Sequence, residues 1–192
     1  GIALATADRG KTWKPLALAG VQALLCGEPV SLPAFHNAQL AQWVEQLLAS
    51  GRIGAVYLFS GQMGQYLPAS WPGRVVADLV DVDSAKFEAF AGEQGWPMRW
   101  VHAREGRCLA AVEAALARRA DVTLLVSEQE AALLRSRIHG PADVRALGNG
   151  IYCANFDPAA VVPQPELAAT PGPHFVFTGQ MDYRPNVAAV AR

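Results

Sequence analysis

Runs of apolar residues alternate with amphipathic segments along most of the chain. The runs 53–59, 75–80 and 122–126 are apolar almost throughout, as expected of strands buried in a parallel sheet. Between them, 38–49 and 101–119 place apolar side chains at helical spacing. Strands that alternate with helices predict an α/β fold, a Rossmann-like parallel sheet with helices on both faces.

Capping residues and turns mark where these elements start and stop. A helix is expected to begin at Asp83 or Ser84, which are both good N-cap residues. Ser127 and Glu130, just ahead of another apolar helix, match a capping box. The other predicted elements are strands at 2–5, 144–147 and 174–178, and helices at 16–26, through 63–66 and from Pro185.

Proline density divides the chain into two domains and a linker. The segment 157–173 holds five prolines, which remove backbone donors and prevent regular structure, so we predict a linker there. One domain is expected over 1–156, and a second one starts at 174–192. The chain starts on a strand-like stretch and ends inside an apparent helix, so we expect a fragment of a longer protein.

Composition and charge narrow the possible partners. The chain is 52% hydrophobic and 17% charged, which predicts a sizeable core, and its net charge of -1 gives no attraction for nucleic acid. Cys26, Cys108 and Cys153 are odd in number and far apart, which favours reduced thiols in a cytoplasmic protein over disulfides or a metal site. No apolar run reaches the roughly 18 residues that span a bilayer.

Candidate chemistry lies at the carboxyl ends of the predicted strands, where parallel sheets bind ligands. Asp78, Asp81 and Asp83 surround the end of the strand 75–80, and Lys86 follows one turn later. These carboxylates could orient substrate hydroxyls or act as a base. The alternative is that they only cap a helix.

The helix predicted at 101–119 carries ionisable residues at its start. His102 and Glu105 share a face with the apolar positions of this helix, and Arg104 lies between them. Because the helix leads into a parallel strand, its start lies near the carboxyl edge of the sheet, and both residues are expected to face the same cleft. A buried structural pair is the alternative. Ser60, which follows another strand, lines the cleft or forms a simple turn.

Several segments in this order resemble one family. They are CGEPVSLP at 26–33, DLVDVDSAK at 78–86, RE at 104–105, VSE at 126–128, NG at 149–150 and FTGQMDYRPN at 177–186. The set resembles bacterial glycosyltransferases associated with the PEP-CTERM/exosortase system, which belong to the retaining glycosyltransferase family 4. The resemblance spans nearly the whole chain, and the segments at 78–86 and 177–186 are its specific portion.

The resemblance implies a GT-B fold, in which two Rossmann-like domains face each other across a cleft. Residues 1–156 would form an incomplete acceptor-side domain that lacks its first strand, and 174–192 would start the donor-binding domain. The implied enzyme moves a sugar from a nucleotide-sugar donor to a lipid-linked or polysaccharide acceptor in exopolysaccharide biosynthesis, without a metal or other cofactor. The fragment alone is expected to be inactive.

Site residues follow from the strand ends and the resemblance together. The catalytic candidates are Asp81 and Glu105. The acceptor-binding candidates are Asp78, Asp83, Lys86, His102, Arg104 and Ser60. The donor-binding candidates are Asn149, Gly150, Gly179 and Arg184. Many relatives carry a histidine where this chain has its aspartates, so no catalytic histidine is carried over.

Two other functions remain open at this point. One is a sugar-nucleotide epimerase, which shares the two-domain architecture, and the other is a non-enzymatic Rossmann-like binding domain. Peripheral contact with the inner membrane is a further expectation. It depends on a small basic and aromatic cluster at 9–14, for which a solvated loop is the alternative.

Overall fold

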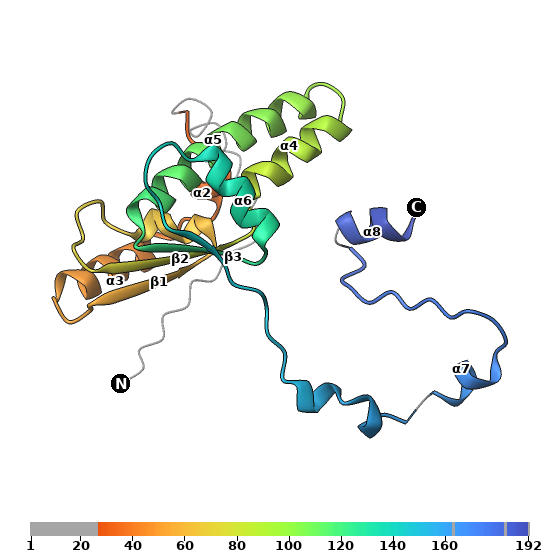
Figure 1. Cartoon of the computed structure of the whole chain (residues 1–192). Coiled ribbons are helices and arrows are strands. Elements are labelled where there is room, and N and C mark those ends of the chain that lie inside the picture. Colours follow the sequence, from red (N-terminus) through yellow and green to blue (C-terminus); the bar gives the residue numbers. More distant parts are fainter. Residues whose placement is uncertain (1–26, 163, 183, 192) are drawn as a thin grey trace. The chain divides into compact units, whose positions relative to one another are not determined.

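The computed structural model describes residues 27–162, 164–182 and 184–191 (Figure 1). These residues divide into two compact units, on either side of the bond between Asn149 and Gly150. The strand predicted at 2–5, the helix predicted at 16–26 and the basic and aromatic cluster at 9–14 lie outside the described residues.

The first unit contains a four-stranded parallel sheet. Its strands are β1 (Ala55–Phe59), β2 (Arg74–Val80), β3 (Val122–Leu125) and β4 (Val144–Ala146), and they lie side by side in this order. Leu58 pairs with Ala77, Ala77 with Thr123, and Thr123 with Val144, so these four residues form one row across the sheet. The α/β class and the parallel sheet predicted from the sequence are confirmed.

Helices precede and connect the strands. They are α2 (Ser31–Ala34), α3 (Ala38–Ala49), the 3-10 helix η1 (Gly61–Tyr66), α4 (Asp83–Glu93), α5 (Met98–Arg119) and α6 (Glu128–Arg137). The predicted bounds of α3 are confirmed, because the side chain of Asn37 caps its start by accepting a hydrogen bond from the N–H of Leu40 at 2.9 Å. Helices α4 and α5 form a hairpin whose connecting turn points away from the sheet (Figure 1).

The hydrophobic core lies on one face of the sheet. Leu58, Leu79 and Leu125 point into it and are at most 8% exposed, and α3, α5 and α6 supply the apolar side chains packed against them. Tyr57 and Phe59 point to the opposite face and are 57% and 63% exposed. The expected covering of both faces is therefore not found among the described helices. The reason is the strand order, because each strand is added on the same edge of the sheet. Right-handed connections between such strands all pass over the same face.

Helix α5 is the longest element and begins three residues earlier than predicted, directly after Pro97. Its buried side includes Leu109 and Leu116 together with the charged residues Glu105 and Glu113. Among the residues that the structure describes, no helix has both the length and the apolar character needed to cross a membrane.

The second unit consists of short elements. They are the 3-10 helices η2 (Cys153–Phe156) and η3 (Pro158–Ala160) and the helices α7 (Pro165–Ala169) and α8 (Arg184–Val190). The strand predicted at 174–178 is wrong, since none of the described residues of this unit lies in a strand. An apolar run becomes a strand only when a neighbour pairs with its backbone groups, and Phe175 is instead 92% exposed.

Candidate functional site

The carboxyl end of β2 bends sharply into α4. Val80 has a φ of 68°, which is strained for a β-branched residue. The pairing with β3 shifts register between Asp78 and Val80, and the Asp78 carboxylate accepts a hydrogen bond from the N–H of Val80 at 3.1 Å. This bulge starts the segment 80–84, which we call the strand-end turn.

Two glutamates from other helices hold the strand-end turn. Glu130 of α6 accepts a hydrogen bond from the N–H of Val82 at 2.7 Å. Glu113 of α5 accepts hydrogen bonds from the N–H of Ser84 at 2.9 Å and from its hydroxyl at 2.6 Å. Val82 and Ser84 are 1% and 0% exposed. The turn is therefore fixed at every second residue.

We call Glu113 and Glu130, with the N–H groups that they hold, the glutamate clamp. Its contacts differ from the helix cap that the sequence predicts for α4. The helix begins at Asp83, and its N-cap residue, Val82, makes no side-chain hydrogen bond. The predicted capping role of Asp83 or Ser84 is wrong because carboxylates from α5 and α6 occupy the N–H groups near the helix start. The capping box at Ser127 is half formed: its hydroxyl accepts from the N–H of Glu130, but the Glu130 side chain turns to the strand-end turn.

Asp81 and Asp83, which lie on either side of the buried Val82, belong to a polar network. The Lys86 ammonium lies 2.8 Å from Asp81 Oδ2 and 3.1 Å from Asp83 Oδ1. Gln62 Nε2 donates to Asp83 Oδ2 at 2.9 Å, and the hydroxyl of Ser60 donates to Gln62 Oε1. We call these five residues the strand-end network. They connect the carboxyl ends of β1 and β2.

Hydrogen bonds and neighbouring charges keep the ammonium of Lys86 protonated. Burial lowers the pKa of Lys86, but the hydrogen bonds and charges of Asp81 and Asp83 outweigh it and leave the pKa raised. Lys86 is therefore positively charged at neutral pH and forms an ion pair with each of the two carboxylates. The side chains of Asp81, Asp83 and Lys86 are 34%, 26% and 39% exposed, so a ligand can reach them from solvent.

Backbone strain occurs at both strand ends. Ser60 has a φ of 76°, and with Val80 it forms the pair of non-glycine residues with positive φ in the described chain. The two positions are linked through β2, since the N–H of Ser60 donates to the carbonyl of Asp78 at 2.7 Å. Strained backbone of this kind clusters at functional sites, where the surrounding structure holds it in place.

Asp78 lies beside this network but has different partners. Its Oδ2 accepts a hydrogen bond from the hydroxyl of Tyr57, and its Oδ1 accepts from the N–H of Val80. The hydrogen bond to Asp78, with smaller effects of burial and of its charge, raises the pKa of Tyr57. Asp78 therefore supports the bulge and belongs to the exposed face of the sheet.

Glu105 and Arg104 hold the segment that leads into α2. Glu105 is 4% exposed, and its two oxygens accept hydrogen bonds from the N–H groups of Val30 and Ser31 at 2.7 and 2.9 Å. Arg104 is 9% exposed and donates to the carbonyl of Glu28 at 3.0 Å. Both side chains are buried, and these contacts give them a structural role in positioning the segment 28–31.

His102 lies in an aromatic cluster between α4 and α5. Its ring centroid is 5.7 Å from that of Phe87 and 5.8 Å from that of Phe90. Its Nδ1 is buried and has no hydrogen-bond partner. This packing joins the two helices of the hairpin, whereas Glu105 contacts the segment 28–31, so the two residues predicted to face one cleft have different neighbours.

The donor-binding candidates lie at and beyond the unit boundary. Asn149 and Gly150 follow β4 and are exposed. A Cβ at Gly179 would lie 2.7 Å from the Nδ2 of Asn186, which donates to the carbonyl of Gln180 at 2.9 Å. A larger residue at this position would displace the Asn186 side chain, which holds the loop to the start of α8. The helix begins at Arg184, whose side chain lies outside the described set.

Sequence reasoning missed Glu113 and Glu130 as members of the site, and it considered Gln62 only as part of the segment 60–63 that follows a strand. Glu113 gave a usable signal, because it stands four residues after Leu109 and three before Leu116, on the buried side of the helix. A charged residue at such a position implies a buried partner. Gln62 gave a weaker one, since it follows a predicted strand by three residues.

Comparisons with known proteins do not assign a function to the site. No protein-family model matches the chain, and neither curated proteins nor solved structures give a significant match. Within residues 27–162, 164–182 and 184–191, no three His, Cys, Asp or Glu side chains are grouped to hold a metal ion. Cys108 and Cys153 are free thiols, and Cys26 lies outside the described residues.

Proposed function

We propose that this chain belongs to a retaining glycosyltransferase of GT-B architecture, and that the strand-end network binds a hydroxyl group of the sugar acceptor. The observation that carries the proposal is the alternation in the strand-end turn. Val82 and Ser84 are clamped in the interior, while Asp81 and Asp83 point toward Lys86 and solvent. Fixed carboxylates beside a cation are suited to orient a polar ligand.

Asp81 is the best placed candidate for a base in this proposal. Lys86 occupies its Oδ2, and within the described residues no hydrogen bond is made to its Oδ1. That oxygen would accept the hydrogen bond of the acceptor hydroxyl. The hydroxyl oxygen then bonds to the anomeric carbon of the donor on the same face from which the phosphate departs, which retains the configuration. The bond from that carbon to the phosphate oxygen breaks, and the proton passes to the base. The positively charged Lys86 holds the Asp81 carboxylate in place for this task.

Three further considerations support the proposal. Ligands of parallel α/β sheets bind at the carboxyl ends of the strands, which is where the network lies. Ser60 and Val80 store backbone strain at the same edge. The segment 78–86, which carries the network, is also one of the two specific segments of the resemblance to glycosyltransferases.

The remaining expectations belong to the same proposal. The donor is a nucleotide sugar, and Asn149, Gly150, Gly179 and Arg184 contact it. The protein acts in the cytoplasm on a glycan or lipid-linked acceptor. Glu105 and Arg104 act indirectly in this scheme, because their contacts hold the segment 28–31.

Titration of the chain with oligosaccharides and nucleotide sugars, followed by NMR, tests the proposal. We expect saturable shifts of the amide signals at 60–62 and 81–86 with a glycan, and a Kd raised about tenfold by Asp81→Asn, since a charged hydrogen bond is lost. Asp143→Asn is the matched control. Asp143 is an exposed carboxylate just before β4, and its Oδ2 lies 2.6 Å from the Nη2 of Arg145 in that strand. Absence of saturable binding, or equal binding by Asp81→Asn, would contradict the proposal.

A further inference from the structure

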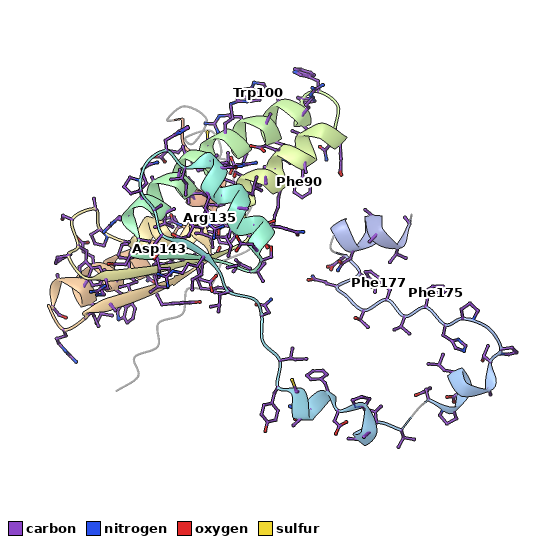
Figure 2. All side chains as sticks on the ribbon, in the orientation of Figure 1. Phe90, Trp100, Arg135, Asp143, Phe175 and Phe177 are labelled. Atoms are coloured by element: carbon purple, nitrogen blue, oxygen red, sulfur yellow. The ribbon has the colours of Figure 1, made fainter. Side chains whose placement is uncertain are left out.

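The turn of the α4–α5 hairpin exposes large apolar side chains. All six residues of 95–100 are exposed, and we call this segment the hairpin tip. Trp96, Met98 and Trp100 are 85%, 43% and 53% exposed. Figure 2 shows Trp100 at the end of the hairpin, where α4 and α5 extend beyond the sheet. Two indole rings and a thioether so exposed on one turn indicate a contact surface.

The outer surface of α5 adds positive charge to this tip. Arg99, Arg107 and Arg118 are exposed, and no ion pair involves them among the described residues. With successive residues about 100° apart on a helix, Trp100, Arg107 and Arg118 fall within about 20° of one another, and Arg99 lies in the hairpin tip itself. The two acidic residues of α5, Glu105 and Glu113, are 4% and 5% exposed. The outer side is therefore basic without opposing carboxylates of its own.

We propose that the hairpin tip and the basic side of α5 dock on the surface of a phospholipid bilayer that contains anionic lipids. Tryptophan prefers the boundary between headgroups and acyl chains, because its ring is apolar and its N–H is polar. Arginines beside such rings are attracted to anionic headgroups. Tryptophans and arginines occur together on this projecting hairpin, and this combination favours a bilayer over a soluble glycan. A glycan would stack on a tryptophan ring but would not need several arginines.

This surface is separate from the strand-end network and does not depend on sugar transfer. His102, Phe87 and Phe90 pack the two helices together behind the tip. Glu113 and Glu130 anchor the start of α4. The tip is therefore carried on a braced hairpin, and it can present its tryptophans without a change of fold.

Flotation of the 192-residue chain with vesicles tests the proposal. One set of vesicles contains phosphatidylcholine alone, and the other contains phosphatidylcholine and phosphatidylglycerol in equal amounts. We expect the chain to float with the anionic vesicles, and we expect added salt to weaken binding because it screens the arginines. Failure to float with the anionic vesicles at low salt would overturn the proposal.

Substitutions separate the two contributions. The double variant Trp96→Ser/Trp100→Ser should lower the partition coefficient by roughly tenfold or more, because both rings lose their apolar contact. Arg99→Gln and Arg107→Gln should each lower binding to anionic vesicles by about fivefold. Phe175→Ser, which removes a ring that is 92% exposed in the other unit, is the control and should bind as the wild type does.

Fluorescence identifies which ligand the tip contacts. Lipids with brominated acyl chains should quench the wild-type tryptophan emission, and this quenching should be lost in the double tryptophan variant. Circular dichroism should give the same melting curve for both proteins, because the two rings are exposed. Equal vesicle binding by the double variant would overturn the proposal. So would a soluble glycan that alters the emission of these tryptophans while vesicles do not.

Discussion

Glu105, Glu113 and Glu130 direct their carboxylates to backbone N–H groups of other segments, whereas Asp81 and Asp83 direct theirs to Lys86 and solvent. The glutamates come from helices that pack beside the segments they hold. The aspartates follow a strand directly, where the chain leaves the sheet. Both sets are acidic, but Glu105 and Glu113 are at most 5% exposed, whereas the side chains of Asp81 and Asp83 are 34% and 26% exposed.

The difference separates structural from chemical roles. A buried carboxylate that accepts backbone hydrogen bonds stabilises the fold, because its loss leaves buried donors without an acceptor. A partly exposed carboxylate paired with lysine adds little stability, because water replaces the pair at low cost. Substitutions of the glutamates should therefore change the free energy of unfolding, and substitutions of the aspartates should change binding.

Glu113→Ala should have the largest effect on stability. The variant leaves the N–H and the hydroxyl of Ser84, which is 0% exposed, without their acceptor. We expect the free energy of unfolding to fall by about 2–3 kcal/mol, measured by urea denaturation. Glu113→Gln is the control and should lose less, because its amide can still accept from the Ser84 N–H. Equal stability of Glu113→Ala and the wild type would show that the clamp is dispensable.

Glu105→Ala should have the next largest effect. It removes the acceptor of two N–H groups, those of Val30 and Ser31, and we expect a loss of about 1–2 kcal/mol because these groups are only partly buried. Hydrogen exchange of the same two amides should become faster than in the wild type. Unchanged exchange of the Val30 and Ser31 amides would argue against the role of Glu105 in holding the segment 28–31. Glu105→Gln keeps one acceptor oxygen and should fall between the two.

The pH dependence of stability should report the burial of Glu113. Burial raises the pKa of its carboxyl, although hydrogen bonds from Ser84 and the charge of Arg137 oppose the shift. The folded protein then binds this proton more tightly than the unfolded chain. The resulting stabilisation is complete below the ordinary glutamate pKa and is lost as the pH rises through the raised value.

Comparison of the wild type with Glu113→Gln isolates this effect. Urea denaturation over a pH series should show that the stability difference between the two proteins shifts in favour of Glu113→Gln as the pH rises through that window. The other carboxylates titrate alike in both proteins and cancel in the difference. A difference that does not change with pH would mean that the raised pKa of Glu113 is absent.

Local pattern predicts the elements of this fold better than their partners. The bounds of α3 followed from its apolar spacing, and the structure adds a cap from Asn37 that acts within the same helix. The strand expected at 174–178 failed because pairing depends on a neighbouring strand, which apolar composition does not supply. Helical spacing predicted that His102 and Glu105 share a face of α5, but it does not say what each of them meets. His102 packs against α4, and Glu105 holds the segment 28–31.

In the candidate site, too, local features could be predicted and long-range contacts could not. Position after a strand was enough to predict that Asp81, Asp83 and Lys86 belong together. The clamp was out of reach, because Glu113 and Glu130 act on residues 29 and 48 positions away in the sequence. Contacts over such separations depend on how the helices pack on the sheet, and a single sequence does not specify this packing.

Asp81→Asn should have the smallest effect on stability and gives the sharpest contrast with the glutamates. Its side chain is 34% exposed and its partner Lys86 is 39% exposed, so we expect the free energy of unfolding to change by no more than about 0.5 kcal/mol. Lys86 keeps Asp83 at 3.1 Å, which limits the disturbance. A loss as large as that of Glu113→Ala, in the same urea titration, would make Asp81 a structural residue. A near-normal stability together with weakened glycan binding would instead assign its carboxylate to the ligand.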